Sequence, residues 1–125
     1  MNDLGMTSYE RRPNVYVLDL YGLASAEALR AGDKSAAWMD YAVRVHDVSL
    51  AIVYPDLFHI PATWTPLARM CGPENVVSAE KCVVFFSTTP DATAQIRKEL
   101  IQFGKTIPKE DTFELDPTRD LVGDL

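Results

Sequence analysis

The chain has 125 residues, of which 47% are hydrophobic and 24% are charged. These proportions are typical of a single globular domain that buries its own core. Its formal net charge is -6 at pH 7 and its basic residues are scattered, so neither nucleic acid nor an anionic membrane is expected as a partner. The first 13 residues lack the apolar core of a signal peptide and no apolar run is long enough to span a membrane, so the sequence predicts a cytoplasmic protein.

Residues 1–13 are polar and are predicted to be a flexible leader to a globular domain at 14–108. Residues 14–21 are dense in β-forming residues and predict a strand. One face of this strand is wholly apolar, and only Asp19 interrupts the other, so a covered strand is expected. Asp19 lies near the carboxyl end of the strand, where it could bind a ligand or simply accept hydrogen bonds from nearby backbone N–H groups.

The segment at about 34–52 is predicted to be an amphipathic helix. Its apolar stripe recurs at mostly three- and four-residue steps and consists of Ala37, Trp38, Tyr41, Val45 and Val48. The end of the helix is ambiguous, because 49–54 could be a separate strand or could continue the helix. Continuation is favoured because Ile52 extends the stripe, and Pro55 ends either structure.

The segment at 55–64 is an apolar loop punctuated by Pro55 and Pro61. Its side chains must either pack on the core or be presented to a partner, and large aromatic residues are common anchors of protein interfaces. The sequence therefore predicts a partner-binding surface here, formed by Tyr54, Leu57, Phe58, His59, Ile60 and Trp64.

Three further elements follow in the chain. Start and stop signals predict a short helix between Thr65-Pro66 and Gly72-Pro73, at 66–71. Residues 81–88 predict a second strong strand, and Thr89-Pro90 begins a helix at 90–103 that Gly104 ends. The hydroxyl groups of Thr88 and Thr89 at this strand-to-helix turn are a candidate anion site, with plain helix capping as the alternative.

No pattern typical of a catalytic, metal or cofactor site was found in the sequence. Cys71 and Cys82 match neither a zinc motif nor a redox motif and are predicted to be buried reduced thiols, although a disulfide would form if their side chains faced each other. Residues 109–125 form an acidic tail with interspersed apolar residues, which is either a docking strap or disordered.

Together these elements predict an α/β (α+β) fold. It consists of a small single-layer sheet of few strands covered by two main helices, in the order β-α-(α)-β-α. We expect a non-catalytic regulatory or adaptor module that binds another protein, for example to antagonise a regulator, and that pairs as a homodimer to cover sheet edges. The alternative is a small-molecule-binding protein or small enzyme with a pocket near Asp19, His59, Trp64 and Thr89.

Overall fold

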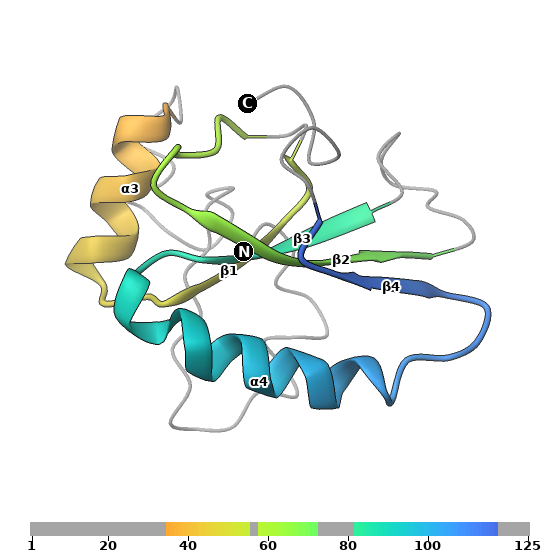
Figure 1. The fold of residues 1–125 in the computed structure, drawn as a ribbon. Coiled ribbons are helices and arrows are strands. Elements are labelled where there is room, and N and C mark those ends of the chain that lie inside the picture. Colours follow the sequence, from red (N-terminus) through yellow and green to blue (C-terminus); the bar gives the residue numbers. More distant parts are fainter. Residues whose placement is uncertain (1–34, 56–57, 73–81, 118–125) are drawn as a thin grey trace.

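The computed structural model describes residues 35–55, 58–72 and 82–117. Their elements are α3 (Ala36–Val45), β1 (Leu50–Val53), β2 (Thr65–Cys71), β3 (Cys82–Ser87), the 3-10 turn η2 (Pro90–Ala92), α4 (Thr93–Gly104) and β4 (Thr112–Leu115). The strands form one antiparallel sheet in the order β1-β3-β2-β4 (Figure 1). A small sheet with two main helices confirms the predicted fold class. The predicted leader and the predicted strand at 14–21, with Asp19, lie outside the described residues.

Each face of the sheet carries its own core, because side chains alternate between the two faces along each strand. We call these faces the α3 face and the α4 face, after the helix that covers each (Figure 1). In β3, Val84 and Phe86 point to the α3 face, whereas Phe85 points to the α4 face. The α3-face core consists of Met39, Ala42, Val43, Ala51, Val53, Phe58, Ile60, Trp64, Val84 and Phe86. The α4-face core consists of Leu67, Ala68, Phe85, Ile96 and Leu100.

Helix α3 is shorter than predicted, and β1 follows it as a separate strand, so the predicted continuation of the helix through 49–54 was wrong. The helix begins after Ser35, whose side chain accepts a hydrogen bond from the Trp38 backbone N–H. It ends because Asp47 adopts a left-handed conformation with φ of 53°. The Asp47 N–H then bonds to the Arg44 carbonyl and the Val48 N–H bonds to the Val43 carbonyl at 2.8 Å. These two bonds form a Schellman motif, which closes the helix without glycine or proline.

Residues 65–71 form strand β2, so the predicted helix at 66–71 was also wrong. The register of β2 against β3 shifts between Pro66 and Ala68, which marks a bulge. A proline is tolerated in a strand at such a position because the bulge releases it from the regular ladder of hydrogen bonds. Beyond the bulge the residues alternate between faces, and Ala68 and Met70 pack on the α4-face core.

The predicted strand at 81–88 and helix at 90–103 are confirmed as β3 and as η2 with α4. Beyond them, the segment predicted as an acidic tail supplies strand β4, which pairs with β2. Phe113 and Leu115 of β4 pack against the α4-face core. The strand ends where Asp116 turns into the left-handed region at φ 51°.

Candidate functional site

The loop predicted to bind a partner is instead part of the α3-face core. Phe58, Ile60 and Trp64 are buried there, and Trp64 has no exposed surface. The Trp64 ring packs on Phe86 with the ring centroids 5.9 Å apart. These large apolar side chains therefore cover the α3 face of the sheet, and they are not available to a partner in this conformation. Of the remaining predicted residues, Tyr54 is half-buried, His59 is exposed, and Leu57 lies outside the described residues.

At the turn between β3 and η2, the Ser87 and Thr88 hydroxyl groups bind other groups of the protein. Thr88 is buried, and its hydroxyl donates to the Val48 carbonyl. The Ser87 hydroxyl lies 2.6 Å from the Thr89 carbonyl oxygen and 2.7 Å from the Thr93 hydroxyl. Thr89 occupies the N-cap position, but its side chain makes no capping hydrogen bond. The Ser87 and Thr88 hydroxyl groups thus tie β3 to the start of α4 and to the segment before β1, and neither is available to an anion.

Helix α3 carries apolar residues on two of its faces, and only one of them is buried. Met39, Ala42 and Val43 point into the α3-face core. Tyr41 and Val45, which the sequence analysis placed in the core-facing stripe, are 51% and 55% exposed. Residues four apart lie on the same side of a helix, so these two side chains form one apolar strip facing solvent. Leu50 at the start of β1 is also 36% exposed, but it lies on the same side of the strand as Ile52 and therefore points to the α4 face. We call Tyr41 and Val45 the α3 surface.

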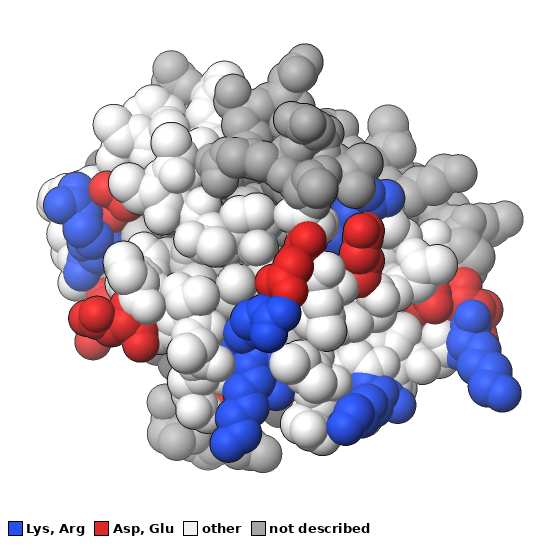
Figure 2. Space-filling model, in the orientation of Figure 1, with Lys and Arg blue, Asp and Glu red and all other residues white. Residues whose placement is uncertain are grey.

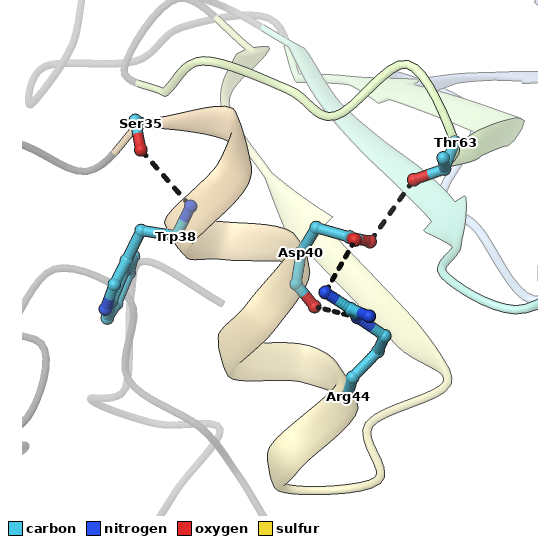
Figure 3. Close-up of polar contacts among 5 residues, drawn as sticks. All are labelled: Ser35, Trp38, Asp40, Arg44 and Thr63. Carbon is cyan, nitrogen blue, oxygen red and sulfur yellow. Dashed lines mark hydrogen bonds and ion pairs between the residues drawn. The ribbon is translucent and has the colours of Figure 1, made fainter.

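A polar contact fixes α3 against the loop that follows β1 (Figure 3). The Asp40 carboxylate accepts a hydrogen bond from the Thr63 hydroxyl at 3.2 Å. The Arg44 guanidinium lies 3.3 Å from the same carboxylate, one helical turn further on. Asp40 thus links the helix to the loop, and this charged pair borders the strip formed by Tyr41 and Val45.

Cys71 and Cys82 form a disulfide, so the prediction of two reduced thiols was wrong. The two residues are direct partners in the β2–β3 ladder, with their Cα atoms 4.1 Å apart. Spacing along the sequence could not show this pairing, because it depends on the register of two strands of which one was predicted to be a helix. The Arg69 side chain, two residues before Cys71, donates a hydrogen bond from Nε to the Cys71 sulfur at 3.4 Å.

An ion pair joins α4 to the end of β4. The Arg97 guanidinium binds the Asp116 carboxylate through two nitrogen atoms. This hydrogen bonding lowers the pKa of Asp116 below its ordinary value and raises the pKa of Arg97. Both side chains are largely in contact with solvent, so the pair is expected to position the end of β4 more than to stabilise the fold.

Charged side chains of both signs are interspersed over the face shown in Figure 2. Within residues 35–55, 58–72 and 82–117, no group of three or more histidine, cysteine, aspartate or glutamate side chains could hold a metal ion. The helices of the same residues are too short or too polar to cross a membrane.

Comparison with known proteins gives one match. The family described as Domain of unknown function (DUF8728) matches residues 1–86, which is more than half of the chain. The chain belongs to this family. No curated protein and no solved structure matches the chain significantly. The part matched by DUF8728 contains α3, β1, β2 and all but the last residue of β3, and therefore includes the α3 surface and the disulfide.

Proposed function

We propose that this DUF8728 protein is a non-catalytic regulatory or adaptor module of the cytoplasm that binds another protein through its α3 surface. The observation that carries the proposal is that α3 has a second apolar face, bearing Tyr41 and Val45, that the core does not use. Tyrosine is among the residues most often found as anchors in protein interfaces.

The geometry of α3 suits a docking surface. Because Asp40 in the middle of α3 bonds to Thr63 and the helix is capped at Ser35, the strip is presented from an anchored helix. A rigid surface loses less conformational entropy on binding than a mobile one. Asp40 and Arg44 beside the strip supply polar groups of the kind found at the rim of interfaces.

Strand β1 offers a second candidate contact, at one edge of the described sheet. It carries no charged residue, since its sequence is Leu-Ala-Ile-Val. At the opposite edge, β4 carries Glu114 and ends at the Arg97–Asp116 ion pair. Charged residues on an edge strand discourage pairing with other chains. Of the two edges of the described sheet, β1 is therefore the better candidate for adding a strand from a partner.

The test is affinity capture of the tagged full chain, followed by mass spectrometry and by binding measurements with the purified partner. We expect one stoichiometric partner, lost when Tyr41→Ser and Val45→Ser are combined. The matched control is Gln102→Ser, an exposed substitution on α4 that should leave binding unchanged. Melting temperatures of all variants show whether they fold.

Light scattering on the purified chain separates a second copy from a different protein as the partner. A dimer that the same double substitution converts to a monomer would identify a second copy as the partner. Full retention of every partner by a folded Tyr41→Ser/Val45→Ser variant would refute the α3 surface as the binding site.

A further inference from the structure

We propose that the Cys71–Cys82 disulfide is a reversible redox site that exchanges with low-molecular-weight thiols, and that Arg69 is its positioning residue. The inference is independent of partner binding and rests on the lower burial of Cys71 and on the cation beside it.

The two cysteines differ in how deeply they are buried. Cys71, at the end of β2, is half-buried, whereas Cys82 is buried at the start of β3. A thiol from solution therefore reaches Cys71 more easily. After the disulfide opens, the pairing of β2 with β3 from Thr65 onward still holds the two cysteines opposite each other.

The contact with Arg69 favours the reduced form of the pair. A disulfide sulfur is a weak, uncharged acceptor, so the hydrogen bond from the Arg69 Nε adds little in the oxidised form. When Cys71 becomes a thiolate, the same donor makes a charge-assisted bond to it. A neighbouring cation thereby favours the thiolate, which is the form of cysteine that takes part in exchange.

The chemistry consumes two equivalents of thiol. A glutathione thiolate attacks the Cys71 sulfur, the bond between the two cysteines breaks, and Cys82 leaves as a thiolate that takes a proton from water. A second glutathione thiolate then attacks the glutathione sulfur of this mixed disulfide, which releases glutathione disulfide and the Cys71 thiolate beside Arg69. The protein gains two electrons, and two glutathione molecules are oxidised. Reoxidation follows the reverse path, with glutathione disulfide as the oxidant.

The experiment equilibrates the purified full chain with buffers that contain a stepped ratio of reduced to oxidised glutathione. Free thiols are then trapped with a maleimide and counted by mass spectrometry. We expect the pair to pass from fully oxidised to fully reduced within the series. Because a charge-assisted bond to a half-exposed thiolate is lost, Arg69→Met should shift the equilibrium constant toward the disulfide by about threefold to tenfold.

Two further variants test whether the positive charge of Arg69 causes the shift in the equilibrium constant. Arg69→Lys keeps the charge and should recover part of the shift. Lys98→Met removes an exposed cation of α4 and should titrate like the wild type. Equal melting temperatures of the oxidised variants show that the shift does not come from unfolding. The proposal is overturned if the disulfide stays closed throughout the series, if it does not form with glutathione disulfide, or if Arg69→Met titrates like the wild type.

Discussion

Replacing Trp64 with alanine tests whether the loop at 54–64 is core or docking surface. Trp64 has no exposed surface and packs on Phe86, and among the residues that the structure describes it is first by volume of the fully buried side chains. Truncating a buried aromatic side chain removes its transfer free energy and leaves a cavity, which together cost about 3–5 kcal/mol. Domains of this size unfold with a free energy of about 5–15 kcal/mol, so Trp64→Ala should lose a large share of the stability. The melting temperature should fall by about 10–20 °C.

The assay is urea denaturation followed by far-ultraviolet circular dichroism, since the substitution itself changes the fluorescence. The matched control is His59→Ala, which truncates an exposed side chain of the same loop and should change the free energy of unfolding by less than about 0.5 kcal/mol. If Trp64→Ala is too unstable to purify, Trp64→Phe can be measured instead and should lower the free energy of unfolding by a smaller amount. A loss below about 1 kcal/mol for Trp64→Ala would refute the assignment of this loop to the core.

Three other variants test the disulfide, the contact between α4 and β4, and the ion pair at the end of β4. The double variant Cys71→Ser/Cys82→Ser opens a covalent loop with a sequence separation of 11. It should lower the free energy of unfolding by about 3 kcal/mol, and the wild type melted in dithiothreitol should match it. Gly104→Ala places a Cβ atom 2.6 Å from the Phe113 ring, so it should destabilise the protein by about 1–3 kcal/mol. A rise in melting temperature, as expected from better helix propensity alone, would contradict that contact. The hydrogen bond from Arg97 holds the pKa of Asp116 below its ordinary value of 3.8. The stabilising effect of the ion pair is therefore present above pH 3.8 and is lost as the pH falls through the lower pKa of Asp116 in the folded protein. The difference in stability between wild type and Asp116→Asn should therefore close in acid, and a difference that persists in strong acid would contradict the ion pair as its cause.

Local signals were sufficient where a single pattern decided the structure. Strand β3 is a continuous apolar run, and α4 follows it after a threonine and a proline that fix the boundary. The signals failed where two structures satisfy the same pattern. Thr65-Pro66 fits both the first turn of a helix and a bulged strand, and only pairing with β3 decides between them. The end of α3 at Asp47 was missed because an aspartate in the left-handed conformation replaces the usual glycine.

The candidate site was predicted less well than the fold, because burial is a property of the assembled protein. Phe58 and Trp64 in a proline-rich loop fit a docking surface and a core lid equally well by composition. On α3, the spacing of Tyr41 and Val45 is as helical as that of Met39 and Val43, and only the position of the sheet shows which pair is buried. A helix with two apolar stripes is itself a signal, since a helix that only covers a core needs one.

The position of the family match within the fold bears on where a shared function lies. Every residue of the α3-face core falls within residues 1–86, the part that DUF8728 matches. The α4-face core does not, because Ile96 and Leu100 come from α4. Strands β1, β2 and β3 nevertheless place Ile52, Ala68 and Phe85 on that second face. Because these side chains are apolar, the matched part needs an element that covers them, and α4 does so here. A different element can cover this face of the sheet in another protein, provided that one side of that element is apolar. A function common to the family has to be carried by the matched part, and the α3 surface and the Cys71–Cys82 pair both lie within it.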